Sequence, residues 1–226
     1  IKRTLKGHYM TIKYIGICGT KGSGKTTLAD IIIKELKQNK HKVIVLPFAK
    51  GIKEVLATTV SMITKMPFEE AIQYFIIPEL KETIIPGINT TARHMMIAFG
   101  TDFVRNINED LWITYTRNQL ETIIEEKDNI QNNTLYVIFD DIRFENEHDF
   151  VKHTLGGNML YISKDKSAFD KDIFAKIKRW VTNYNKHKSE KGLYHLCNSD
   201  MERIINTGTL QELRLQVYAK TMVMCF

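Results

Sequence analysis

Glycines, lysines and hydroxyl residues are gathered in eight positions near the start of the chain. This segment, GTKGSGKT at residues 19–26, fits the pattern G-x-x-x-x-G-K-[ST] that cradles nucleotide phosphates. Its glycines let successive backbone N–H groups point inward and form an anion nest. The ammonium of Lys25 can reach the β and γ phosphates, and the hydroxyl of Thr26 is placed to ligate Mg²⁺. We predict an ATP site formed by Gly19, Lys21, Gly22, Ser23, Gly24, Lys25, Thr26 and Thr27. The alternative is a chance glycine-rich turn, which the flanking strand and helix patterns disfavour.

Two neighbouring carboxylates offer the acid that such a site needs. Asp140 and Asp141 close an apolar run at 135–139, and an aspartate in that place can hold or orient magnesium. Aspartate is also a good helix N-cap, so one of the two has a purely structural alternative. We expect one to face the metal and assign Asp141 and Thr26 as metal ligands.

Cations in the middle of the chain suit a phosphorylated acceptor. Arg93 and Arg105 lie twelve positions apart around Gly100, and Lys53 lies on an earlier predicted helix. A guanidinium matches a phosphate bidentately, so these groups can hold an acceptor phosphate against the γ-phosphoryl group of ATP. We expect Lys25, Arg93 and Asp141 to be the catalytic residues.

Three further residues have a structural alternative beside a functional one. The ring of Trp112 could stack on a base or fill the core of a helical region. Arg143 and Glu147 lie four apart and could form a plain helical ion pair worth a few tenths of a kcal/mol. We favour a role for Arg143 on the acceptor nucleotide. The predicted substrate-binding set is Lys53, Arg93, Gly100, Arg105, Trp112, Asp141, Arg143 and Glu147.

Short apolar runs are the elements that must position these groups. Runs at 12–18, 43–46, 135–139 and 159–162 predict strands, with a fifth at 203–205. Leu28, Ile31, Ile32 and Leu36 have helical spacing between the first two runs, which predicts a right-handed βαβ unit. We expect an α/β fold of the P-loop NTPase type, with a mostly parallel five-stranded sheet flanked by helices.

Residues 50–133 separate the second and third strands and read as helices, at 50–64, 91–106 and 112–126, interrupted by Pro67, Pro78 and Pro86. An insertion there would lie at the carboxyl edge of the sheet, where open α/β folds bind ligands. We predict one kinase domain over 10–226, with its core at about 10–50 and 134–226. The helical acceptor-binding insertion would span about 51–133 and a lid about 164–191.

The net charge of +6 is unevenly distributed. Residues 1–50 hold eleven Lys and Arg against two acids, and residues 163–191 hold nine against four. Such blocks indicate a polyanionic partner without identifying it. The second block, with Lys176, Lys178 and Arg179 beside Trp180, has the position of a lid, and its alternative is a solvated amphipathic helix.

Cysteine content and hydropathy exclude several classes of protein. Cys18, Cys197 and Cys225 are too few and too scattered for a disulfide framework, and no Cys/His cluster has metal-ligand spacing. Neither a membrane-spanning stretch nor the order of a signal peptide is present. We expect a cytoplasmic protein without a membrane partner. The oligomeric state is open, with a homodimer as one alternative.

Several segments together resemble one kinase family. The segment DIRFENE at 141–147 resembles the D-V-R-F-x-N-E segment of the phage-type deoxynucleoside monophosphate kinases, a branch of the nucleoside monophosphate kinase-like P-loop fold. Phe48-Ala49 with Ile52-Lys53, the set Arg93, Gly100-Thr101-Asp102, Arg105 and Trp112, and NTGTL at 206–210 are similar to further family segments. The resemblance extends from about residue 12 to 215. It implies transfer of the γ-phosphate of ATP, with Mg²⁺, to a deoxynucleoside 5′-monophosphate for DNA precursor supply, in a virus and hence in host cytoplasm.

Two other functions stay open. HKSE at 187–190 resembles a segment of animal-type phosphomevalonate kinases, and dephospho-CoA kinases share parts of the layout, so the acceptor could be a phosphorylated metabolite. Base stacking would account for Trp112, whereas a mevalonate site does not need it. A nucleotide-dependent DNA-binding protein is the third alternative, but the sequence has no helix-turn-helix or zinc signature. We therefore expect small nucleotide substrates and no stable nucleic-acid complex.

Overall fold

The computed structural model describes residues 11–127, 134–164, 193, 196 and 201–225. The predicted lid lies outside these residues except for Lys164, and so does the basic block around Trp180. The chain forms two compact units, residues 1–47 with 122–226 (unit 1) and residues 48–121 (unit 2). Within the described residues, no helix is both long and apolar enough to cross a membrane.

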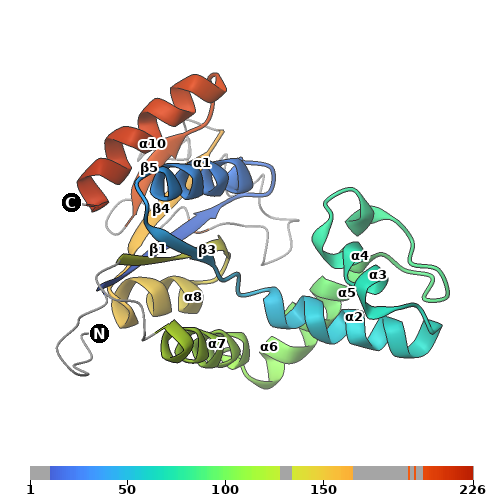
Figure 1. Ribbon diagram of the computed structural model, residues 1–226. Coiled ribbons are helices and arrows are strands. Elements are labelled where there is room, and N and C mark those ends of the chain that lie inside the picture. Colours follow the sequence, from blue (N-terminus) through green and yellow to red (C-terminus); the bar gives the residue numbers. More distant parts are fainter. Residues whose placement is uncertain (1–10, 128–133, 165–192, 194–195, 197–200, 226) are drawn as a thin grey trace. The chain divides into compact units, whose positions relative to one another are not determined.

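Unit 1 is built on a parallel sheet of five strands, shown in Figure 1. The strands are β1 (Thr11–Gly19), β2 (Lys42–Val45), β3 (Thr134–Ile142), β4 (Asn158–Ser163) and β5 (Glu202–Ile205). Their order is β2-β3-β1-β4-β5, and every pair is parallel. All five predicted strands and the parallel sheet are confirmed. β1 and β2 do not pair, because β3 lies between them. The connection from β1 to β2 therefore skips one strand position of the sheet.

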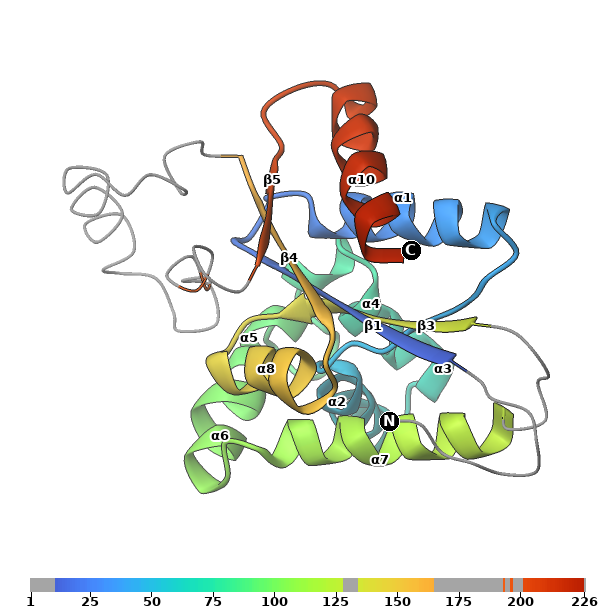
Figure 2. The same ribbon diagram turned by 90° about the vertical axis from the view of Figure 1, so that its left-hand side faces the viewer.

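Helices cover both faces of this sheet, as Figure 2 shows. On one face, α1 (Lys25–Gln38) and α10 (Leu210–Cys225) pack together over a core of aliphatic side chains. The predicted helical stripe of α1 is buried here, with Leu28 and Ile32 fully inaccessible. On the other face lies α8 (Glu145–Asp149), which continues as the π-helical segment η3 (Phe150–Thr154). The rings of Phe150 and Phe139 meet edge to face with centroids 6.5 Å apart.

Unit 2 consists of helices and turns. Its elements are α2 (Lys50–Thr64), α3 (Phe68–Ala71), α4 (Gln73–Ile76), the 3₁₀ turn η1 (Leu80–Glu82), α5 (Ala92–Ile97), the π-helical η2 (Ala98–Phe103), α6 (Val104–Ile107) and most of α7 (Leu111–Lys127). They enclose a small core of their own around Leu56, Val60, Phe75 and Ile85. Helices predicted at 50–64 and 112–126 are confirmed.

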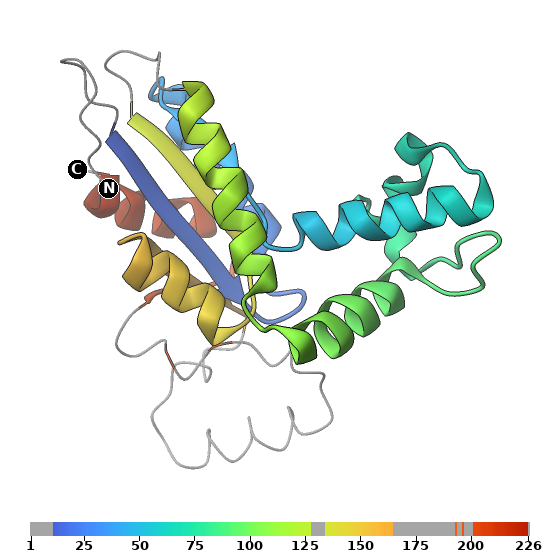
Figure 3. The ribbon, with the colours of Figure 1, turned by 90° about the horizontal axis from the view of Figure 1, so that it is seen from below.

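The helix predicted at 91–106 is present but not uniform. Figure 3 shows α5, η2 and α6 as one coiled run, in green. The π-helical turn in its middle inserts at Gly100, which is buried. A side chain there would collide with Ile52 of α2, since a Cβ on Gly100 would stand only 2.7 Å from the Cδ1 of Ile52. Glycine therefore lets this run approach α2 closely.

Candidate active site

The loop at residues 19–26, called the P-loop below, joins β1 directly to α1. Gly19, Gly22 and Gly24 have φ values of 151°, 74° and 103°, a region that side chains with a Cβ rarely enter. Gly24 is the N-cap of α1 in the left-handed conformation, and the helix begins at Lys25. The predicted order of strand, loop and helix is confirmed.

The P-loop is held against the ends of the neighbouring strands. The Asn206 side-chain amide donates to the Ser23 carbonyl at 2.8 Å, and the Asn206 backbone N–H donates to the Ser163 carbonyl at 2.8 Å. A Cβ on Gly24 would collide with the Asn206 amide, and one on Gly19 would collide with the Ile162 carbonyl of β4. Asn206, the first residue of the NTGTL segment, thus supports the P-loop.

The N-terminus of α1 offers positive potential, and its own first turn holds no carboxylate. The helix has fourteen residues, no acidic residue in its first turn and no side-chain cap. Thr26 and Thr27 are exposed on that turn, whereas Ser23 is buried, and the Ser23 hydroxyl has no hydrogen-bond partner among the described residues. First-turn N–H groups and the helix dipole favour a phosphate at this position. A bound phosphate would also give the Ser23 hydroxyl an acceptor.

Lys25 folds back onto its own loop. Its ammonium donates to the carbonyls of Gly19 at 2.8 Å and Thr20 at 2.9 Å. Burial, and after it the nearby Arg143 charge, lower the pKa of Lys25 to about 8, while Cys18, Asp141 and Asp140 act in the opposite direction. The ammonium, Arg143 and the two aspartates therefore belong to one electrostatic neighbourhood.

A bulge in β3 presents the two aspartates. β1 and β3 pair at Gly16 with Phe139 and again at Cys18 with Ile142, so β3 holds one extra residue between these points. Asp140 and Asp141 occupy this bulge, which re-aims side chains relative to a regular strand. Carboxylate and hydroxyl oxygens are the ligands that Mg²⁺ prefers, so Asp140, Asp141 and Thr26 fit such an ion chemically.

Glu147 is placed differently from a surface ion-pair partner. Its side chain is buried, with 3% exposure, and one carboxylate oxygen accepts the backbone N–H groups of Arg143 at 2.8 Å and Phe144 at 3.2 Å. These contacts close the two-residue turn between β3 and α8. In these contacts Glu147 accepts from the backbone, which differs from the ion pair with the Arg143 side chain that the sequence offers as an alternative.

The predicted acceptor cations all lie in unit 2. Arg93, at the start of α5, forms an ion pair with Glu82 of η1. Arg105 donates to the Glu109 carbonyl at 3.1 Å, and Lys53 is half-buried on α2. Arg93 and Arg105 come from the two ends of the single α5–η2–α6 run, so this run presents both guanidinium groups.

Trp112 lies in the core of unit 2. It is 4% exposed, its indole N–H donates to the Gly100 carbonyl at 3.1 Å, and its ring meets Phe99 edge-on with centroids 6.3 Å apart. A ring enclosed in this way has no free face for a base. Trp112 is therefore a core residue, and the prediction that its ring stacks on a base is wrong.

Two side-chain hydrogen bonds between α2 and α7 could not be predicted from the sequence. The Tyr115 hydroxyl donates to Glu54 at 2.6 Å between α7 and α2, and burial together with this hydrogen bond raises the pKa of Tyr115 to about 12. Lys50 donates to Gln119 at 3.1 Å across the same pair of helices. Both contacts join residues more than sixty positions apart, so local spacing could not predict them.

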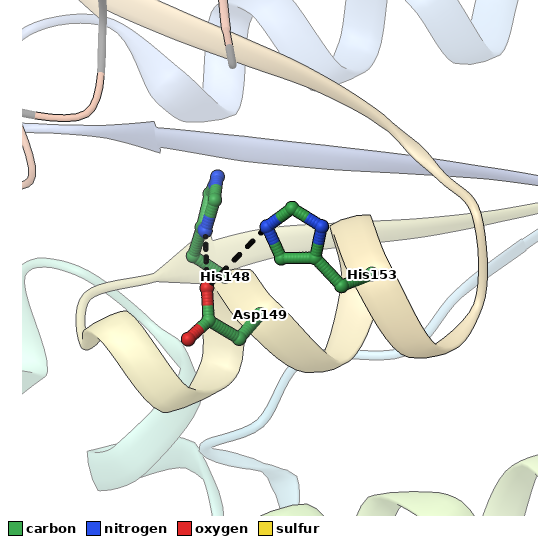
Figure 4. Close-up of side chains that lie close together, drawn as sticks. All are labelled: His148, Asp149 and His153. Carbon is green, nitrogen blue, oxygen red and sulfur yellow. Dashed lines mark hydrogen bonds and ion pairs between the residues drawn. The ribbon is translucent and has the colours of Figure 1, made fainter. Parts of the chain in front are cut away.

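A second group, His148, Asp149 and His153, is shown in Figure 4. Asp149 lies 3.0 Å from Nδ1 of His148, its chain neighbour, and 3.8 Å from Nε2 of His153, four positions further along the same helical segment. The three potential ligand atoms lie within 4.8 Å of one another. A metal-bound imidazole normally donates its other N–H to a partner, and the buried Nε2 of His148 has none among the described residues. This favours a local hydrogen-bonded pair of His148 and Asp149 over a metal centre.

Comparison with known proteins shows which family this chain matches. The family model described as deoxynucleotide monophosphate kinase matches residues 65–217. A protein of Acanthamoeba polyphaga mimivirus, provisionally described as a deoxynucleotide monophosphate kinase, is 28% identical over 212 residues, covering 90% of this chain and 93% of the relative.

Similar solved structures include two small-molecule kinases. A gluconokinase from Sinorhizobium meliloti 1021 is 11% identical with a TM-score of 0.36, covering 94% of this chain and 93% of its own. A shikimate kinase from Acinetobacter baumannii, in complex with shikimate, is 13% identical with a TM-score of 0.32, and 94% of each chain is covered. The P-loop fold of the present chain is recognised from its own strand order and its loop at 19–26.

Proposed function

Because the chain belongs to the deoxynucleotide monophosphate kinase family, we propose that it transfers the γ-phosphate of ATP to a deoxynucleoside 5′-monophosphate. The products are ADP and a deoxynucleoside diphosphate. The observation that carries this proposal is the P-loop with its bare helix N-terminus and its inward-turned Lys25. The family match begins at residue 65, beyond the P-loop, so the two lines of support concern different parts of the chain.

The donor half of the site uses the P-loop. The N–H groups at the start of α1 bind the phosphates of ATP, and Lys25 leaves the carbonyls of Gly19 and Thr20 for the more strongly charged phosphate oxygens. The Ser23 hydroxyl gains an acceptor. Mg²⁺, held by Thr26 and Asp141, would neutralise charge on the phosphate oxygens.

The acceptor half uses the guanidinium groups of unit 2. Arg93 exchanges its ion pair with Glu82 for the acceptor phosphate, which it can grip bidentately, and Arg105 and Lys53 add further positive charge. One oxygen of that phosphate attacks the γ-phosphorus while the bond to the β–γ bridging oxygen breaks. No nucleophilic side chain is required, since positioning and charge neutralisation supply most of the rate enhancement in phosphoryl transfer.

A kinase acting on a phosphorylated metabolite is the second candidate. One observation keeps this function open: because Trp112 is buried, it no longer provides evidence for a nucleotide acceptor over a metabolite acceptor. The family match favours the nucleotide. Since the mimivirus relative is viral, we further infer that the chain supplies DNA precursors in the cytoplasm of an infected host cell.

A coupled assay of ADP release tests the acceptor. The full chain is supplied with Mg-ATP and, separately, with each deoxy- and ribonucleoside monophosphate, phosphomevalonate and dephospho-CoA. Lys25→Ala and Arg93→Ala are compared with Arg214→Ala, which removes an exposed cation from α10. We expect turnover with at least one deoxynucleotide, lost in the first two variants and kept in the third. Turnover confined to a metabolite would assign the second candidate instead.

A further inference from the structure

We infer that Glu147 is a positioning residue: its buried carboxylate fixes the turn that carries Arg143 and does not itself bind the acceptor. This inference rests on the proposed function for the meaning of Arg143, but its geometry is independent of any substrate. It changes the role expected for Glu147 from the sequence, where it was grouped with the substrate-binding residues.

The turn that carries Arg143 is short. β3 ends at Ile142 and α8 begins at Glu145, so Arg143 and Phe144 alone connect strand and helix. Phe144 is extended, with φ −122° and ψ 154°, and its N–H precedes the helix. One oxygen of Glu147 receives the N–H groups of both turn residues, at 2.8 and 3.2 Å. A carboxylate acceptor makes both bonds charge-assisted.

Because Glu147 is buried, only a side chain with a hydrogen-bond acceptor suits its position. Glu147 is 3% exposed, and a buried carboxylate is tolerated when it is well hydrogen-bonded. Removing it would leave two backbone donors of a half-buried turn without this acceptor. Glutamine keeps an oxygen of the same reach, so it should preserve most of the turn, whereas alanine should not.

Arg143 links the turn to the P-loop. It follows Ile142, which pairs with Cys18 directly before the P-loop, and it lies two positions after Asp141 of the β3 bulge. A shift of the turn would therefore move a cation that shares the phosphate site with Lys25. Glu147 acts on phosphate binding and transfer through Arg143, so its effect should disappear once Arg143 is absent.

A double-mutant cycle in the full chain tests this dependence. We compare wild type, Glu147→Ala, Arg143→Ala and the double variant by Mg-ATP affinity without acceptor, and by kcat and KM with any acceptor turned over. Glu147→Ala should lower kcat or ATP affinity about tenfold in wild type and by less than about twofold in the Arg143→Ala background. Glu147→Gln should stay within about threefold of wild type.

Amide hydrogen exchange gives a readout of the turn itself. The N–H groups of Arg143 and Phe144 should be protected in wild type and Glu147→Gln and exchange faster in Glu147→Ala. If Glu147→Ala does not fold, Glu147→Asp, whose shorter side chain cannot reach both donors, takes its place.

Two results would overturn the inference. One is a multiplicative effect of the two substitutions, and the other is a raised acceptor KM in Glu147→Gln with unchanged exchange at the turn, which indicates direct contact. A wild-type chain that binds Mg-ATP but phosphorylates no acceptor would defeat the proposed function alone, because ATP affinity and exchange still decide the role of Glu147.

Discussion

At the scale of single residues, the protonation of Lys25 should depend on whether ATP is bound. Its ammonium is satisfied by two loop carbonyls, yet burial and the charge of Arg143 lower its pKa to about 8. A bound triphosphate would stabilise the ammonium and raise this pKa again. Binding of ATP should therefore be coupled to uptake of a proton near and above pH 8.

This coupling predicts a pH dependence of ATP affinity. Below a pKa of about 8 the ammonium is already protonated, and above it each pH unit should weaken binding by up to about tenfold. Phosphate groups, with a second pKa of about 6, are largely ionised at about pH 7 and do not change charge above about pH 8. Calorimetric titration from about pH 7 to about pH 10 in two buffers measures both affinity and proton uptake. In Lys25→Met the proton uptake should vanish, and an unchanged slope there would assign the effect to another group.

A second residue-scale prediction concerns Trp112. Because it is a core residue, Trp112→Ala should destabilise the protein by about 3–5 kcal/mol. Trp112→Phe keeps an aromatic ring but leaves the Gly100 carbonyl without its donor, at a cost of about 1–3 kcal/mol. Urea denaturation measures both. The acceptor KM of Trp112→Phe should stay within about twofold, and a large rise in KM at unchanged stability would restore the base-stacking interpretation.

At the scale of elements, two glycines of the P-loop form a matched pair. Both have positive φ, so alanine at either position carries the left-handed cost of about 1–2 kcal/mol. A Cβ on Gly22 meets open space, whereas one on Gly24 collides with the Asn206 amide that supports the loop. We expect Gly24→Ala to weaken ATP binding by more than about tenfold and Gly22→Ala by clearly less. Equal losses in titration calorimetry would show that Asn206 does not hold the loop.

Local patterns were sufficient to predict the elements but not their details. Strands and most helices follow from apolar spacing, and the P-loop motif carries its own flanking elements. The bulge at Asp140 and Asp141 depends on the pairing partner of β3, which spacing along one strand does not contain. Trp112 was ambiguous because its burial depends on Gly100 and Phe99, twelve and thirteen positions away. The carboxylate of Glu147 could equally have pointed to Arg143 or to the backbone.

At the scale of the whole molecule, ligand binding should appear as stability of the nucleotide-binding unit. A ligand at about 100 times its Kd adds about 2.7 kcal/mol, which is about 5–10 °C for a protein of this size. Mg-ATP should therefore raise the unfolding temperature of unit 1 in differential scanning calorimetry, and Arg214→Ala should respond like wild type. Lys25→Ala should lose most of the shift. A shift that survives in Lys25→Ala would mean that ATP is held elsewhere.

The central claim is that phosphate passes from ATP to a deoxynucleoside monophosphate. The most direct measurement follows the label of γ-³²P-ATP, in the presence of Mg²⁺ and each deoxynucleoside monophosphate, and separates the products by chromatography. We predict that label appears in a deoxynucleoside diphosphate with wild type and Arg214→Ala but not with Lys25→Ala. Label that appears only as inorganic phosphate, or only in a ribonucleotide or metabolite product, would contradict the claim.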